Sequence, residues 1–167
     1  MNILEVFFDY ECPYCMKGYE YLRKHLPAHP EITVVFRPCE AHPRPEDHPP
    51  HTDLAIQGYY FAKVKNNDLH AYNTRLFEAV HKDEIDVENP HVLADYVADL
   101  VDRDDYVRVL QDGTYREIQE KGNDYAYEDN DVWFLPAFRM NGETLDAVGD
   151  VGVTEEQVSD FLRKAKR

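Results

Sequence analysis

The chain is short of cysteine, of basic residues and of long apolar runs, and each shortage excludes a class of protein. Three cysteines in 167 residues are an odd number and do not form the paired framework of a disulfide-stabilised secreted domain. No apolar stretch reaches the roughly 20 residues that a transmembrane helix needs. The N-terminal MNILEVFFDYE has no basic region before its apolar run and no small-residue cleavage site after it, so we expect no secretory signal. These features predict a reducing, cytoplasmic location, where a disulfide is transient and catalytic.

The scarcity of basic residues gives the chain a strongly negative charge. Lys and Arg number 18 against 33 Asp and Glu, for a net charge of −15. Such a charge favours solubility and opposes binding to nucleic acid or to anionic membrane surfaces. Hydrophobic residues nevertheless make up 43% of the chain and aromatic residues 13%, which predicts a folded protein with a substantial core rather than a disordered chain.

The first forty residues carry the pattern of a strand, a helix and a second strand. The apolar run over residues 3–8 has the length of a buried strand, and so has the run over residues 32–36. Between them, Pro13 suits the first turn of a helix that we expect to reach about Leu26. Two strands joined by a helix lie parallel with a right-handed crossover, and we expect that arrangement here.

The middle of the chain reads as a loop followed by helices. Residues 38–50 are rich in Pro, His and acidic residues and show no periodicity, which is typical of a loop. Four helical patterns follow, within residues 54–62, 69–80, 90–100 and 107–118. These patterns predict four helices in succession.

Two local signals define the C-terminal part. Asn141-Gly142 lies between two extended runs and predicts a β-hairpin, because both residues tolerate the positive φ angles of a tight turn. The segment Thr154-Glu155-Glu156-Gln157 is a capping box that opens a final helix. The chain therefore ends in two strands and a helix.

The complete order is β-α-β, a helical block, then β-β-α. This order predicts an α/β protein of thioredoxin-like fold with a central all-helical insertion domain. We place the thioredoxin-like domain at residues 1–50 and 129–167 and the helical insertion at residues 51–128.

Cys12 and Cys15 lie between the first predicted strand and its helix. Residues three apart on a helix share a face, so their sulfurs can reach bonding distance. At the helix N-terminus the thiolate of Cys12 would accept free backbone N–H groups, which lowers its pKa below roughly 8.5. Cys12 is then the attacking nucleophile and Cys15 the buried thiol that resolves the mixed disulfide. A zinc ribbon would need a second cysteine pair, which the chain lacks.

The segment Phe7–Gly18, FFDYECPYCMKG, resembles the active-site segment of DsbA-like proteins. It is most similar to the FrnE-type branch, which has an Asp three residues before the first Cys and often a Gly three after the second. The resemblance extends to the architecture, a thioredoxin fold interrupted by a helical domain. It implies a thiol–disulfide oxidoreductase without a bound cofactor, which exchanges disulfides with protein thiols or with glutathione.

The resemblance also implies a role for Leu135 and Pro136. DsbA-like proteins carry a cis-proline before the third core strand, facing the cysteine pair and presenting backbone to the substrate. Pro136 stands directly before the run AFRM, where that proline belongs. Many relatives have a short pair such as Gly-Val before this proline, whereas Phe134-Leu135 is bulkier, and we expect a different substrate preference. The residues expected to contact substrate are Pro13, Tyr14, Leu135 and Pro136.

Two alternative functions follow from other features. Kappa-class glutathione transferases and 2-hydroxychromene-2-carboxylate isomerases share this architecture, but they usually have Ser in the place of Cys12. The second alternative is a metal-binding module, because Cys39, His42, His48 and His51 are four ligand-type residues within one loop. The spacing matches no common zinc finger, so the sequence predicts no native metal site.

Four further residues have two interpretations each. Cys39 is either a third thiol beside the active site or a buried, inert cysteine, and we favour the second. Glu5 and Asp9 are candidates for a carboxylate that relays the proton of the buried thiol, against a surface or capping role. Trp133 lines either an apolar surface near Pro136 or the core.

Overall fold

The computed structural model describes all 167 residues, which divide into two compact units. Unit 1 comprises residues 1–38 and 124–167, and unit 2 comprises residues 39–123. Both boundaries lie earlier than the sequence predicts. The first boundary lies at residue 38 instead of 50 because the predicted loop after Pro38 belongs to the helical unit. The Glu40 side chain is buried there, at 4% exposure.

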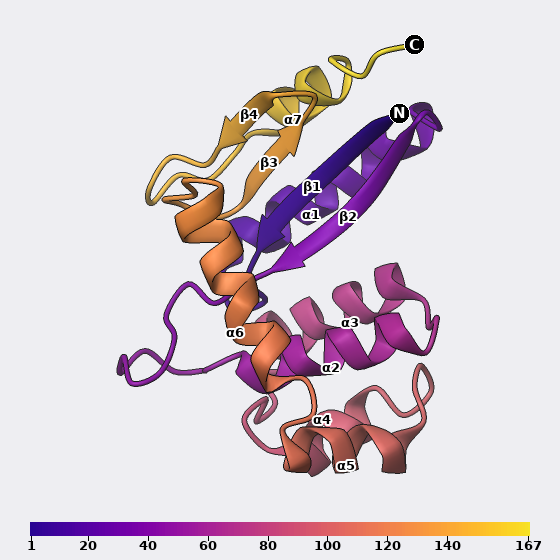
Figure 1. Ribbon diagram of the computed structural model, residues 1–167, viewed down its shortest axis with the longest axis vertical. Coiled ribbons are helices and arrows are strands. Elements are labelled where there is room, and N and C mark those ends of the chain that lie inside the picture. Colours follow the sequence, from indigo (N-terminus) through magenta and orange to yellow (C-terminus); the bar gives the residue numbers. More distant parts are fainter. The chain divides into compact units, whose positions relative to one another are not determined.

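Unit 1 is built around a four-stranded mixed sheet in the order β2-β1-β3-β4. The indigo N-terminal strand lies beside an orange strand from the last third of the chain in this sheet (Figure 1). Strands β1 (Asn2–Phe8) and β2 (Ile32–Pro38) pair in parallel, as predicted, whereas β3 (Ala137–Met140) pairs antiparallel with both β1 and β4 (Glu143–Asp146). The predicted α/β thioredoxin-like order is confirmed.

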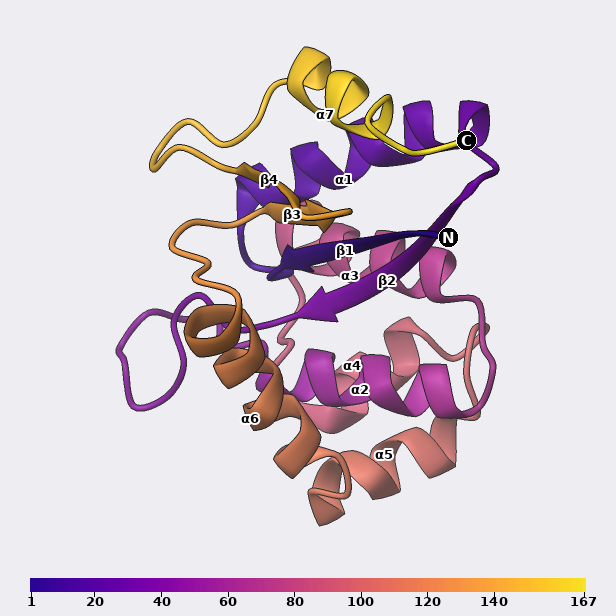
Figure 2. The same cartoon turned by 45° about the horizontal axis from the view of Figure 1, so that its top comes forward.

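Two helices cover one face of this sheet. Helix α1 (Pro13–His25) and helix α7 (Glu155–Leu162) lie beside each other on that face (Figure 2), and a short 3₁₀ helix, η1 (Leu26–Ala28), ends the first of them. The predicted capping box is present, because Thr154 and Gln157 exchange side-chain-to-backbone hydrogen bonds at the start of α7. The tight turn is present as well, with φ angles of 53° at Asn141 and 77° at Gly142. Local signals in the sequence therefore account for these elements.

The π-helical turn η2 (Tyr125–Asp129) contributes an aromatic ring to β1 of the same unit. The ring of Tyr125 stacks on Phe7 with centroids 5.9 Å apart, and its hydroxyl donates to Glu5 Oε2 over 2.6 Å. The guanidinium group of Arg37 lies 4.5 Å from the centre of the same ring and also bonds Glu5. Glu5 therefore serves a structural ion pair, not a proton relay to the cysteines.

The regular elements of unit 2 are all helices. They are α2 (Asp53–Val64), α3 (Leu69–His81), α4 (Pro90–Tyr96), α5 (Arg103–Asp112) and most of α6 (Arg116–Asp124). In its core the hydroxyl of Tyr72 donates to Ala55 O over 2.7 Å and lies 2.9 Å from the hydroxyl of Tyr106. A Cβ atom at Gly58 would overlap both hydroxyls, so only glycine leaves room for this pair.

The single helix predicted for residues 107–118 is wrong. Helix α5 ends at Asp112, because Gly113 takes the left-handed conformation with φ of 68° and caps it. Helix α6 then begins afresh at Arg116. The apolar spacing continues across the break, and for that reason periodicity alone did not reveal it. No helix of the chain combines the length and the apolar character that crossing a membrane would require.

Candidate functional site

Cys12 and Cys15 lie at the junction of β1 and α1, where the sequence predicts them. Cys12 is the N-cap of α1, with an extended backbone (φ −85°, ψ 115°), and Pro13 occupies the first helical position. Extended backbone at the cap leaves the first N–H groups of the helix directed at the Cys12 sulfur. The chain thus turns from strand to helix at the residue that carries the first thiol.

The sulfur of Cys12 is held in an anion-stabilising position. Its Sγ atom accepts a hydrogen bond from the backbone N–H of Cys15 over 3.2 Å. The pKa of Cys12 is lowered from its ordinary value, chiefly by the hydrogen bond from the Cys15 side chain, with partial burial opposing the effect. Helix N-terminal N–H groups act in the same direction, because they favour the charged form. Cys12 retains 9% exposure against 1% for Cys15, so it is the more accessible residue of the pair.

Cys15 has the opposite environment. It is 1% exposed, and burial raises the pKa of its thiol well above the ordinary value. Burial disfavours the charged form of an acid, so Cys15 stays protonated where Cys12 ionises. The two thiols share a helix face but differ in access and in acidity.

Leu135 and Pro136 lie against this pair. The peptide bond between them is cis, which is the isomer that the family resemblance predicts. The Cys12 thiol donates to the carbonyl oxygen of Leu135 over 3.8 Å. A Cβ atom at Gly18, one turn beyond Cys15, would lie 2.9 Å from the Cγ of Pro136. The proline therefore packs directly on a helix position that has room only for glycine.

Asp9 lies beneath the same turn. It is 1% exposed, its Oδ1 accepts from the Glu11 N–H over 3.2 Å, and its carbonyl oxygen accepts from the Cys12 N–H over 3.2 Å. The charge of Asp9 raises the pKa of both thiols, although it is a smaller cause than burial or hydrogen bonding. Of the two acidic candidates, Asp9 is the one whose field reaches the cysteines.

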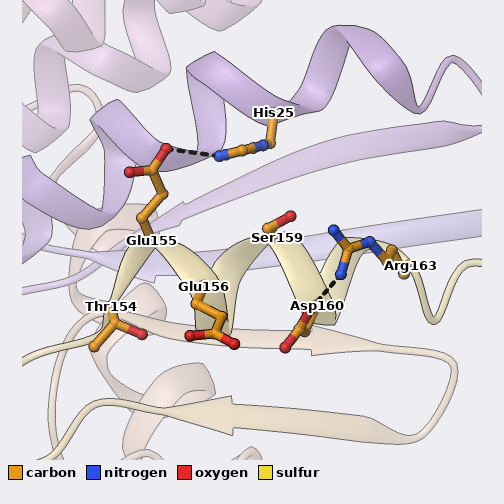
Figure 3. Close-up of a pocket in the computed structure, with 7 residues that line it drawn as sticks. All are labelled: His25, Thr154, Glu155, Glu156, Ser159, Asp160 and Arg163. Carbon is orange, nitrogen blue, oxygen red and sulfur yellow. Dashed lines mark hydrogen bonds and ion pairs between the residues drawn. The ribbon is translucent and has the colours of Figure 1, made fainter.

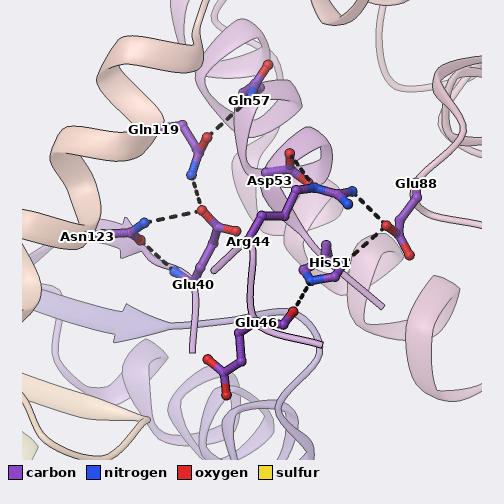
Figure 4. A network of polar contacts seen from close by, with 9 residues as sticks. All are labelled: Glu40, Arg44, Glu46, His51, Asp53, Gln57, Glu88, Gln119 and Asn123. Carbon is purple, nitrogen blue, oxygen red and sulfur yellow. Dashed lines mark hydrogen bonds and ion pairs between the residues drawn. The ribbon is translucent and has the colours of Figure 1, made fainter. Parts of the chain in front are cut away.

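The four residues of the predicted loop ligand set do not come together, because Cys39 and His51 belong to no group of side chains that could hold a metal ion. Cys39 is 0% exposed, as the favoured interpretation of a buried cysteine requires. The rings of His42 and His48 stack with centroids 3.6 Å apart. His51 uses both ring nitrogens, one on Glu88 Oε1 at 3.2 Å and one on Glu46 O at 2.7 Å (Figure 4). His51 therefore anchors the loop and offers no free nitrogen to a metal.

Unit 2 also contains a buried polar network that sequence reasoning missed. The carboxylate of Glu40 accepts from the side-chain amides of Gln119 and Asn123, and Gln57 donates to Gln119 over 3.3 Å (Figure 4). The partners are about eighty residues apart in the chain, so no local pattern links them.

A shallow polar pocket lies on α1 and α7 of unit 1, away from the sulfur atoms. It is lined by His25, Glu155 and Ser159 among others, and the His25 Nε2 is 2.9 Å from a Glu155 oxygen (Figure 3). The Glu155 carboxylate also pairs with Lys24 at 2.6 Å. These contacts tie the end of α1 to the start of α7, and we read the pocket as structural.

The exposed position of Trp133 favours one of its two interpretations. Its side chain is 84% exposed, so it belongs to the surface and not to the core. Val148 and Val151, which the sequence analysis did not single out, are exposed as well. The only sequence signal for them is the pair Gly149 and Gly152, which marks the turn that carries them.

Comparisons with known proteins agree with this geometry. The model of the DSBA-like thioredoxin domain family matches residues 3–164. The protein YwbO of Bacillus subtilis (strain 168) is 23% identical, over 96% of this chain and 98% of that protein.

Solved structures show the same fold. A probable DsbA oxidoreductase from Streptomyces coelicolor superimposes with a TM-score of 0.80 at 14% identity, covering 98% of this chain and 89% of its own. Oxidised BdbD from Bacillus subtilis gives 0.74 at 16% identity, covering 98% and 86%. The chain therefore belongs to the family of DSBA-like thioredoxin domains, whose DsbA-type members are thiol–disulfide oxidoreductases.

Proposed function

We propose that this protein exchanges disulfides with polypeptide substrates through Cys12 and Cys15. The observation that carries the proposal is the contrast between the two sulfurs. Cys12 keeps 9% exposure, has a lowered pKa and accepts a hydrogen bond from the Cys15 N–H, whereas Cys15 is 1% exposed and has a raised pKa. A nucleophile whose thiolate is stabilised and a resolving thiol that stays protonated until needed are the two components that disulfide exchange requires.

The reaction proceeds in two displacements. The Cys12 thiolate attacks one sulfur of a substrate disulfide, forms a mixed disulfide and releases the other substrate sulfur as a thiolate. Cys15 then loses its proton and attacks the Cys12 sulfur, which forms the Cys12–Cys15 disulfide and releases the second substrate thiolate. The protein loses two electrons and the substrate gains them; the proton of Cys15 goes to the solvent, from which the released thiolates are protonated. The reverse sequence oxidises a substrate dithiol.

The neighbouring residues have positioning roles in this proposal. Pro136 and Leu135 present backbone beside the attacking sulfur, and the Leu135 carbonyl oxygen accepts a hydrogen bond from the Cys12 thiol when that thiol is protonated. Pro13, which is exposed, and Tyr14, which is half-buried, lie between the two cysteines. The two electrons that are transferred come from the sulfur atoms of Cys12 and Cys15, so the exchange needs no bound cofactor.

Trapping of the mixed disulfide tests the proposal. Cys15→Ser should accumulate a covalent adduct with a disulfide-bonded polypeptide such as insulin, because no second thiol resolves it. Cys12→Ser, the matched control, should form no adduct, because the remaining thiol of the pair is buried. Adducts on both variants, or on Cys39 alone, would contradict the assignment. An adduct with glutathione disulfide but never with a polypeptide would favour a glutathione-dependent function instead.

A further inference from the structure

Half of the large apolar side chains that the molecule exposes belong to two loops of unit 1. The first loop precedes β3, and the second lies between β4 and α7. Eight such residues are exposed in the whole chain, and four of them are Trp133 at 84%, Phe134 at 53%, Val148 at 59% and Val151 at 64%. We call these four the Trp133 surface. Single exposed apolar side chains are ordinary, but a cluster indicates a binding site.

The contacts of unit 1 make this cluster continuous with the cysteine pair. The ring of Phe134 lies against Gly149, where a Cβ atom would be 2.8 Å from the ring. Tyr14, between the two cysteines, lies against Gly152 in the same way, at 2.9 Å. Val148 and Gly152 form an isolated β-bridge that closes the second loop. The next residue after Phe134 is Leu135, whose carbonyl oxygen accepts from the Cys12 thiol.

The two loops of the Trp133 surface carry only negative charge. The one basic residue within residues 124–162, Arg139, pairs with Asp146 and donates to Asn130 O. Residues 1–16, 124–138 and 140–162, which include both loops and the cysteine pair, contain no Lys or Arg. Asp131 and Asp150 are exposed within the two loops, each with a positive φ, 51° and 59°. Neither forms an ion pair. An apolar surface with unpaired carboxylates at its edge attracts cations and disfavours anions.

We propose that the Trp133 surface selects a cationic polypeptide segment, one in which Lys or Arg flanks an apolar residue next to the reacting cysteine. The apolar residue would pack on Trp133 and Phe134, and the cationic groups would lie near Asp131 and Asp150. The proposal rests on the proposed disulfide exchange and adds the chemistry of its substrate. An arginine or lysine over an exposed tryptophan also gains from the ring face.

The first experiment compares peptides in mixed-disulfide formation with the Cys15→Ser variant. Each peptide contains one activated cysteine beside a leucine, flanked by two lysines, by two glutamates or by two serines. We expect the lysine peptide to react about tenfold faster than the glutamate peptide at low salt, with the difference shrinking at high salt. Exchange of the unmodified protein with dithiothreitol, a neutral small dithiol, reports the proposed function separately.

Trp133 provides a direct readout of contact. It is the only tryptophan of the chain, so all tryptophan emission comes from this surface. In the adduct with the lysine–leucine peptide its emission should shift to shorter wavelength and its quenching by acrylamide should fall. A lysine–serine peptide, which lacks the apolar residue, should leave the emission nearly unchanged.

Matched variants separate local charge from total charge. Asp131→Asn with Asp150→Asn removes both carboxylates, and Asn accepts their positive φ angles. We expect the lysine-to-glutamate rate ratio to fall to about twofold. Asp124→Asn with Glu156→Gln changes the net charge equally and should leave the ratio near tenfold.

Three outcomes would overturn the proposal. Equal rates for the lysine and glutamate peptides would exclude charge selection, and an unshifted tryptophan emission would exclude contact with the surface. An equal effect of both double variants would show that net charge acts and not the surface. If dithiothreitol exchanges and the peptides show no selectivity, only this proposal fails. If neither exchanges, the proposed function fails first.

Discussion

The backbone N–H of Cys15 donates a hydrogen bond to the sulfur of Cys12 over 3.2 Å, while the sulfur of Cys15 is buried behind it. One residue thus stabilises the thiolate of the other and is itself kept protonated. The two effects have the same geometric origin, the turn from β1 into α1, and the proposed division into attacking and resolving thiol follows from it.

Removal of the Cys15 side chain should raise the pKa of Cys12. The side-chain hydrogen bond from Cys15 is the largest cause of the lowered value, and Cys15→Ala removes it while the backbone N–H remains. The thiolate fraction of Cys12 at neutral pH should therefore fall. Cys15→Ser keeps a donor and should have a smaller effect. The pH dependence of thiolate absorbance measures both, in a Cys39→Ser background. A lower pKa in Cys15→Ala would contradict this assignment.

Addition of one methyl group at Gly18 should disturb Pro136. In Gly18→Ala the new Cβ would lie 2.9 Å from Pro136 and 3.3 Å from Val153, so the proline must shift. We expect a loss of about 1–3 kcal/mol in the free energy of unfolding, together with slower disulfide exchange. Lys17→Ala, on the exposed side of the same helix, serves as control and should change neither by much. If Gly18→Ala left both the stability and the exchange rate unchanged, the close contact between Gly18 and Pro136 would not restrict the side chain at position 18.

The two buried tyrosines of unit 2 should differ in their importance. Tyr72→Phe removes the donor to Ala55 O and leaves the Tyr106 hydroxyl without its partner, which should cost about 1–3 kcal/mol. Tyr106→Phe removes a buried hydroxyl and keeps the bond to Ala55, and it should cost less than about 1 kcal/mol. Denaturant unfolding of the two variants measures the difference. Equal losses would mean that the hydroxyl pair, and not the bond to Ala55, dominates.

His51 should stabilise its loop more at acidic than at alkaline pH. The hydrogen bond to the carbonyl oxygen of Glu46 is the main cause that raises the pKa of His51, and Glu88 acts in the same direction. A raised folded-state pKa adds stability that is complete below the unfolded value of about 6.5. That stability is lost as the pH rises through the folded value. His51→Gln should therefore lower the midpoint of denaturant unfolding more at about pH 5.5 than at about pH 8. An equal decrease of the midpoint at both pH values would contradict this link between the protonation of His51 and stability.

Local signals in the sequence predicted most of unit 1. The hairpin turn at Asn141-Gly142 and the capping box at Thr154 each act within a few residues, and the structure has both. The position of the cysteine pair is likewise fixed by one strand end and one proline at the first helical position.

Features that depend on distant partners could not be predicted in this way. Glu40 is buried because Gln119 and Asn123 satisfy its carboxylate from far along the chain, and the predicted unit boundary was therefore too late. Phe134, next to the exposed Trp133, packs over Gly149, a contact between loops that no periodicity encodes. The FrnE-type assignment and the cytoplasmic location stay predictions.

The most direct test is a redox titration of the cysteine pair in glutathione buffers, read by the mass added on thiol alkylation, with Cys39→Ser as background. We predict a reversible disulfide between Cys12 and Cys15 with a potential above the roughly −300 mV below which structural disulfides typically lie. Peptide mapping should place the alkylation-protected thiols at these two residues. The absence of a reversible Cys12–Cys15 disulfide at every glutathione ratio would contradict the proposed function.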